Sequence, residues 1–130
     1  MLSKHHIREM AESGLFKIGA HTVNHPKLNK LSYKEQKFEI EYSKKFLEDL
    51  VGMEIVDFAY PFGKYNEITL QILQERGFKR AYTVIPSSLK NICNPFLIGR
   101  MPILKTTTHY FETLLCEGYL KYCNYRRVYP

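Results

Sequence analysis

Hydrophobic residues along this chain follow two alternating periods, one helical and one extended. Apolar residues three and four positions apart, the helical spacing, occur within residues 2–13, 32–52, 66–77 and 108–119. Short apolar runs typical of strands lie between them, at 16–20, 54–60, 80–85 and 96–104. The predicted order is helix, strand, helix, strand, helix, strand, strand, helix. This alternation is typical of right-handed βαβ units around a mainly parallel sheet, so we expect an α/β fold.

The starts of the helices and the ends of the strands carry further signals. Ser32 and Glu35 have the spacing of a capping box, and Asn66 can cap the helix that follows it. A glycine follows each of the first three predicted helices, as expected where a left-handed residue closes a helix. The loops 21–26 and 60–63 come directly after strands, where the reactive groups of α/β folds gather.

Composition fits one globular domain. The chain has 130 residues, of which 45% are hydrophobic and 25% charged, and it contains no repeat or linker. We therefore expect a single domain over 1–130, with residues 120–130 as a tail. No apolar run approaches the roughly 20 residues that a membrane-spanning helix needs. The first six residues lack the apolar core of a signal peptide, so the sequence shows no export signal.

Charge and cysteine content narrow the classes of partner and site. The formal net charge is +6, but the basic residues are scattered, and the one pair of adjacent arginines, Arg126-Arg127, lies in a tyrosine-rich tail from Tyr119 to Tyr129. A frayed helix end is the simpler interpretation of that tail, so nucleic acid is not the expected partner. Cys93, Cys116 and Cys123 are odd in number and form no C-x-x-C pair, which argues against a disulfide framework or a thiolate zinc site.

Two histidines are the strongest candidates for chemistry. His21 and His25 are separated by three residues, a spacing that can direct two imidazoles at one metal ion when the backbone turns back on itself. Pro26 disfavours helical geometry at His25, so a strand end followed by a tight turn is expected. Neutral imidazoles suit zinc, nickel or cobalt, with zinc the first choice. The motif alone leaves surface or loop-capping histidines open as the alternative.

The surrounding sequence resembles a known family. The string from Phe16 to Pro26 resembles the second motif of polysaccharide deacetylases of the NodB-homology type, carbohydrate esterase family 4, in which His-Ser/Thr-x-x-His follows an apolar strand. The resemblance covers about residues 3–115. It continues in order through the segments 28–32, 58–66, 77–81 and 99–103.

This resemblance implies a partial (β/α) barrel and a metal-dependent hydrolase that removes acetyl groups from N-acetylated polysaccharides or oligosaccharides. It implies that His21 and His25 are metal ligands and that the backbone N–H of Phe62 is the oxyanion donor. By position it also implies substrate contacts at the rest of the third motif, namely Tyr60, Pro61 and Gly63. Members of the family often act at the cell envelope or outside the cell, and the sequence leaves the compartment open.

Several family features are missing from the sequence. The first motif, an Asp-Asp segment that supplies the base and the aspartate ligand, has no counterpart here, and Ala59 stands at the arginine position of the third motif. His109 is the one late histidine, but its surroundings do not match the motif of the catalytic acid, and a residue in the first turn of a helix is the preferred interpretation. We therefore expect weak or no activity from this chain alone.

The missing first motif also leads to an expectation about partners. A strand over 16–20 without a preceding neighbour would expose one edge, so self-association or pairing with a separate N-terminal half is expected. Two other functions stay open at this point: a non-catalytic relic that binds metal or carbohydrate, and a basic module that binds anionic polymer or nucleic acid.

Overall fold

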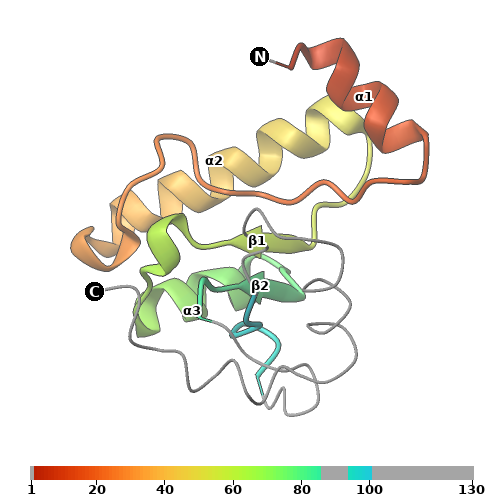
Figure 1. Cartoon of the computed structure of the whole chain (residues 1–130). Helices are drawn as coiled ribbons and strands as arrows, with labels where there is room; N and C mark the ends of the chain where they lie inside the picture. Colours follow the sequence, from red (N-terminus) through yellow and green to blue (C-terminus); the bar gives the residue numbers. More distant parts are fainter. Residues whose placement is uncertain (1, 86–93, 101–130) are drawn as a thin grey trace, which may run out of the picture.

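A computed structural model of the chain describes residues 2–85 and 94–100 (Figure 1). Three α-helices, two short parallel strands and two 3₁₀ turns follow one another in this part of the chain. In chain order they are α1 (Lys4–Glu12), η1 (Leu28–Lys30), α2 (Tyr33–Val51), β1 (Asp57–Ala59), η2 (Pro61–Gly63), α3 (Glu67–Glu75) and β2 (Arg80–Tyr82). The α/β class and the partial barrel expected from the sequence are confirmed by this arrangement.

Each of the three α-helices begins at a capping box, in which a side chain and a backbone amide at the helix start are bonded reciprocally. The three boxes pair Ser3 with His6, Ser32 with Glu35, and Asn66 with Thr69. The predicted caps at Ser32 and Asn66 are therefore confirmed. Gly52 closes α2 with φ of 69°, in the left-handed region that costs glycine nothing.

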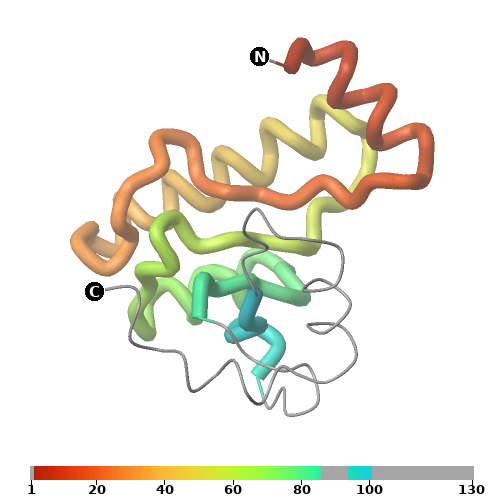
Figure 2. The backbone as a smooth tube through the Cα atoms, viewed as in Figure 1, coloured from red at the N-terminus to blue at the C-terminus, as the bar shows by residue number. Residues whose placement is uncertain are grey.

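The sheet is parallel and extends by single bridges on both sides of the named strands. Phe58 of β1 pairs with Ala81 of β2, Ala20 bridges to Phe58, and Tyr82 bridges to Ile98. Four chain segments thus run in the same direction and in sequence order, as successive strands of a barrel do. Figure 2 shows the chain from Gly14 towards Pro26 running beside α2 on its way past β1.

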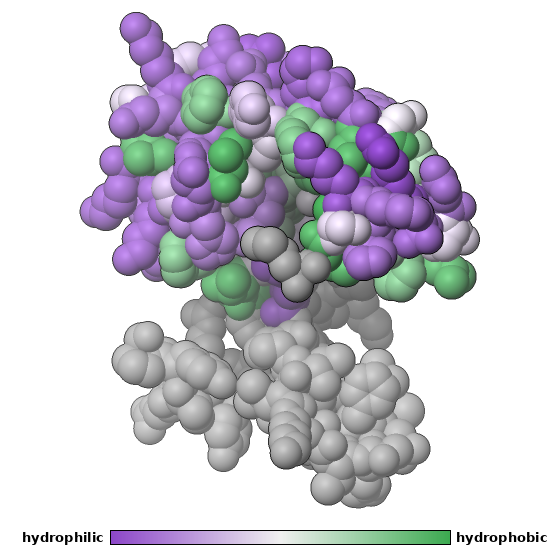
Figure 3. All heavy atoms as spheres, turned by 90° about the horizontal axis from the view of Figure 1, so that it is seen from above, coloured by the Kyte–Doolittle hydropathy of each residue, from purple (hydrophilic) through white to green (hydrophobic). Residues whose placement is uncertain are grey.

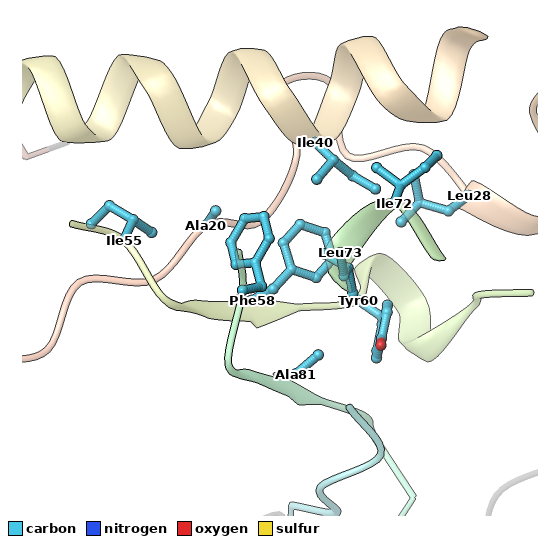
Figure 4. Packing of buried hydrophobic residues seen from close by; sticks show 10 residues of the cluster. Ala20, Leu28, Ile40, Ile55, Phe58, Tyr60, Ile72, Leu73 and Ala81 are labelled. Carbon is cyan, nitrogen blue, oxygen red and sulfur yellow. The ribbon is translucent and has the colours of Figure 1, made fainter. Parts of the chain in front are cut away.

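The hydrophobic core lies between one face of this sheet and helices α2 and α3 (Figure 4). Ala20, Phe58 and Ala81 project from the strands towards Ile40 of α2 and Leu73 of α3. Because side chains alternate along a strand, Asp57, Arg80 and Tyr82 project from the opposite face. This alternation fixes which face of the sheet carries the polar side chains.

The predicted strands are longer than the observed ones. The segment 16–20, expected as a strand, contributes only the bridge at Ala20, and 54–60 and 80–85 shorten to three residues each. The difference follows burial: Leu15 and Phe16 are exposed, whereas Ala20 is buried and bridges to Phe58 of β1. Apolar character therefore extends beyond the residues that pair.

The outward surface is mixed. Seen from above, the molecule is largely hydrophilic with separate apolar patches (Figure 3). Among the described residues, no helix is both long and apolar enough to cross a membrane. The predicted final helix with His109, the three cysteines and the Arg126-Arg127 tail within 120–130 lie outside the described residues.

Candidate functional site

Two loops meet at the C-terminal ends of the parallel strands. The first, 21–26, follows the bridge residue Ala20, and the second, 60–63, follows β1 directly. Parallel strands end at a common edge, so the two loops are brought together there. The rings of His25 and Phe62 make an edge-to-face contact with centres 4.5 Å apart, which joins one loop to the other.

The backbone of β1 fixes the tautomer of His21. Its Nδ1 lies 2.7 Å from the carbonyl oxygen of Ala59. A carbonyl can only accept a hydrogen bond, so Nδ1 carries the proton and Nε2 presents its lone pair. Histidines that ligate metals usually donate their second ring N–H in this way, which sets both tautomer and ring orientation.

The two imidazole rings lie next to each other. The ring centres of His21 and His25 lie 4.8 Å apart with an interplanar angle of 67°. Two imidazoles on one tetrahedral zinc, with Zn–N distances of about 2.0 to 2.1 Å, place their ring centres roughly 5 Å apart. The observed separation therefore fits a shared ion.

Backbone strain is concentrated in the same loops. Three non-glycine residues of the described part have positive φ, and all three are here: Thr22 at 63°, His25 at 55° and Phe62 at 55°. Such a conformation costs about 1 kcal/mol or more per residue and persists only where the surroundings impose it. One such restraint is the Thr22 hydroxyl, which accepts a hydrogen bond of 3.1 Å from the N–H of His25. The predicted absence of a helix through the histidine pair is confirmed.

A buried carboxylate that the sequence pattern did not single out contacts the histidine loop. Glu39 of α2 is 6% exposed and accepts hydrogen bonds from the N–H groups of Val23 and Asn24. Burial opposes its ionisation, but the bonds from Asn24 and Val23 outweigh that cost and lower the pKa of Glu39. The sequence held no signal for this contact, because an acid on a helix is usually solvated and the contact depends on the placement of α2 beside the loop.

The second loop is buried at its start, at Tyr60 and Pro61, and exposed at its tip, at Phe62. The ring of Tyr60 is buried, and its hydroxyl donates to the carbonyl of Phe96 at 2.8 Å. Burial, with a smaller contribution from Tyr65, raises the pKa of that hydroxyl. Pro61 is also buried, whereas the Phe62 ring is half exposed. A side chain at Gly63 would meet Val84, because an added Cβ would lie 2.4 Å from Val84 Cγ2.

The Phe62 N–H makes no hydrogen bond within the described part of the chain. Pro61 before it has no N–H, and the next two amides are used, since Gly63 N–H donates to the Tyr60 carbonyl and Lys64 N–H donates to the Pro61 carbonyl. A free N–H held in a rigid turn is the type of donor that stabilises an oxyanion. Lys27 adds positive charge nearby, with its ammonium 5.7 Å from the centre of the Phe62 ring.

The acidic residues of the described part do not complete the histidine pair. No group of three or more His, Cys, Asp or Glu side chains in residues 2–85 and 94–100 is arranged to hold a metal ion. Asp57 lies at the start of β1, at the opposite end from the histidines, and is paired with Arg80. Asp57 therefore does not lie beside the two histidines.

Known proteins of one family match the chain. Residues 3–81 match the model of the polysaccharide deacetylase family. YxkH of Bacillus subtilis (strain 168), named as a polysaccharide deacetylase, is 33% identical over 105 residues, covering 77% of this chain and 37% of YxkH.

Solved structures agree. The Streptococcus pyogenes deacetylase PplD in complex with acetate superposes with a TM-score of 0.75 at 30% identity, covering 79% of this chain and 45% of PplD. BC0361, a polysaccharide deacetylase from Bacillus cereus, superposes with a TM-score of 0.74 at 28% identity, covering 86% of this chain and 36% of BC0361. The chain spans less than half the length of these relatives. The family model covers more than half of the chain and the structural matches share its fold, so the chain belongs to the polysaccharide deacetylase family, as its sequence motifs implied.

Proposed function

We propose that this chain provides part of the active site of a metal-dependent hydrolase that removes acetyl groups from N-acetylated sugar polymers. His21 and His25 are its proposed metal ligands. The observation that carries the proposal is the proximity of these two rings, whose centres are 4.8 Å apart, with Nδ1 of His21 held by the Ala59 carbonyl. The substrate class follows from membership of the family.

The donor set fits a divalent ion of intermediate softness. Two neutral imidazoles at the end of a sheet suit zinc first, with cobalt or nickel as alternatives. A divalent ion bound there supplies Lewis-acid chemistry for amide hydrolysis. The hydrogen bond from His21 to Ala59 supports this assignment, because it leaves Nε2 as the free ring nitrogen.

The second loop supplies the proposed oxyanion donor. The amide of Phe62 is held by a 3₁₀ turn whose neighbouring amides are already bonded, so the turn keeps its shape while a substrate enters. Removing one such donor from an enzyme typically costs 10²- to 10³-fold in turnover. We propose that Gly63 contributes to substrate contact through its backbone, since an added side chain would meet Val84, and that buried Tyr60 and Pro61 support the loop from beneath.

Hydrolysis also needs groups that the described residues do not place at the histidines. These groups are a base for the attacking water, a further metal ligand, and an acid that protonates the leaving amine. His109, the candidate acid, lies outside the described residues. Two neutral ligands alone do not offset the charge of the ion. We therefore expect weak zinc binding and no deacetylation by this chain in isolation.

Zinc titration by calorimetry tests the ligands. His21→Ala and His25→Ala should each abolish the binding that the unmodified chain shows. His5→Ala is the matched control, because His5 lies on exposed α1 and its removal should leave binding unchanged. Equal binding by all four proteins would contradict the assignment.

The second candidate function is metal or carbohydrate binding without hydrolysis, and it is favoured by the incomplete ligand set of the described residues. Acetate release from chitooligosaccharide by the zinc-loaded chain is the measurement that decides against this second candidate. Release that disappears in His21→Ala would exclude it, whereas binding of zinc and sugar without release is the result that both candidates expect of the isolated chain.

A further inference from the structure

The histidine loop is held by a contact from outside the loop. Glu39 lies in the middle of α2 and reaches the loop with both carboxylate oxygens. Oε2 accepts from the backbone N–H of Val23 at 2.8 Å and of Asn24 at 2.9 Å, and Oε1 accepts from the side-chain amide of Asn24 at 2.7 Å. All three donors lie between His21 and His25 in the sequence.

This set of partners is unusual for a buried acid. No ion pair joins Glu39 to a basic group in the part of the chain that the structure describes, so neutral donors alone stabilise its charge. Burying a charge in this way is costly unless every donor is well placed. The arrangement therefore constrains the loop as strongly as it stabilises the acid.

The geometry of the loop shows what the constraint does. Thr22 and His25 both have positive φ, so the chain reverses between the two histidines. The two residues whose amides bind Glu39 are those inside this reversal. Without the carboxylate, the loop would lose the acceptors that hold it in a conformation disfavoured by its own side chains.

We propose that Glu39 is a positioning residue for the histidine pair: it fixes the reversal at Val23-Asn24 and thereby the separation of the His21 and His25 rings. It touches neither metal nor substrate. The inference rests on the proposed function, because positioning matters only if both histidines bind one ion. It predicts that zinc affinity depends on a side chain outside the loop.

A swap of charge and amide tests the proposal. Asn24→Asp alone sets two carboxylates against each other, and Glu39→Ala removes the acceptor; both should weaken zinc binding by about tenfold or more. The double variant Asn24→Asp/Glu39→Gln exchanges acid and amide across the same contact at unchanged net charge. It should bind zinc more tightly than Asn24→Asp alone and close to the unmodified chain.

Glu41→Gln is the matched control. Glu41 is on the same helix and pairs with Arg76 away from the loop, so its variant should keep its zinc affinity whatever stability it loses with the ion pair. If Glu39→Ala binds zinc as tightly as Glu41→Gln, or if the double variant is no tighter than Asn24→Asp, the proposal is wrong.

Amide hydrogen exchange in the metal-free chain provides the second readout. Val23 and Asn24 should exchange faster in Glu39→Ala than in the unmodified chain, while the amides of α3 stay protected. Unchanged exchange at both residues overturns the inference even if zinc does not bind. Failure of the unmodified chain to bind zinc, with faster exchange in Glu39→Ala, overturns the proposed ligands and leaves Glu39 as the determinant of the loop.

Discussion

The two ends of the parallel strands are built on different principles, although each has a largely buried carboxylate. At the start of β1, Asp57 accepts two hydrogen bonds from Arg80, at 2.6 and 2.8 Å, and one from the Tyr82 hydroxyl at 3.0 Å. At the other end, Glu39 accepts only from neutral amides of the histidine loop. One carboxylate joins neighbouring strands, and the other shapes a loop.

The difference separates stability from function. At the Asp57 end the carboxylate is neutralised by the Arg80 guanidinium, and the residues involved lie within regular strands. The histidine end keeps three residues in left-handed backbone and leaves the Phe62 N–H without a partner in the described part. Parallel α/β folds generally keep their reactive groups at the C-terminal ends of the strands, and the site proposed for this chain lies at that end.

The largest expected effect concerns the strained end. Gly63→Ala should destabilise the chain by about 2 to 3 kcal/mol, because alanine disfavours positive φ and its Cβ would press on Val84. Gly52→Ala is the control, since Gly52 has a similar φ and nothing within 4 Å of an added Cβ. Its cost should be about 1 kcal/mol. Equal urea midpoints for the two variants would show that the approach to Val84 carries no energy.

A smaller loss of stability is expected at the paired end. Asp57→Ala leaves Arg80 without its bidentate partner and should cost about 1 to 2 kcal/mol, reduced because Arg80 is 38% exposed. Zinc affinity should not change, since the pair lies at the other end of the strands. A lower zinc affinity in a stably folded Asp57→Ala chain would contradict the claim that the two ends act independently.

The smallest effect is a dependence on pH. The hydrogen bond and charge of Arg80, with Tyr82, hold the pKa of Asp57 below its ordinary value of 3.8 despite burial. Its contribution to stability is therefore complete above about pH 4 and is lost as the pH falls through the lowered folded-state value. Urea midpoints measured below pH 4 should fall less steeply for Asp57→Asn than for the unmodified chain. Identical slopes would show that this pair does not contribute.

Helices and their caps could be predicted from the sequence because their signals are local. The Ser32–Glu35 box and the Asn66 cap are formed as expected. The lengths of the strands could not be predicted from the sequence, because strand pairing depends on neighbours in space. The apolar run at 16–20 pairs only at Ala20.

The histidine pair could be predicted from its spacing, but its supports could not. His21 bonds to Ala59, 38 residues away, and Glu39 bonds to a loop 15 residues earlier. Neither contact leaves a periodic signal, and helical acids are usually solvated. Such contacts between distant segments become visible only once the fold places α2 beside the loop.

The most direct test of the metal site is X-ray absorption at the zinc edge of the zinc-loaded chain. If His21 and His25 bind the ion, the spectrum shows two imidazole ligands at about 2.0 to 2.1 Å, with oxygen donors filling the remaining positions. His21→Ala should remove the imidazole signal of the pair. A spectrum dominated by sulfur at about 2.3 Å would place zinc on cysteines, and one with no imidazole scattering would place it on adventitious oxygen ligands. Either result would contradict the assignment of His21 and His25 as ligands.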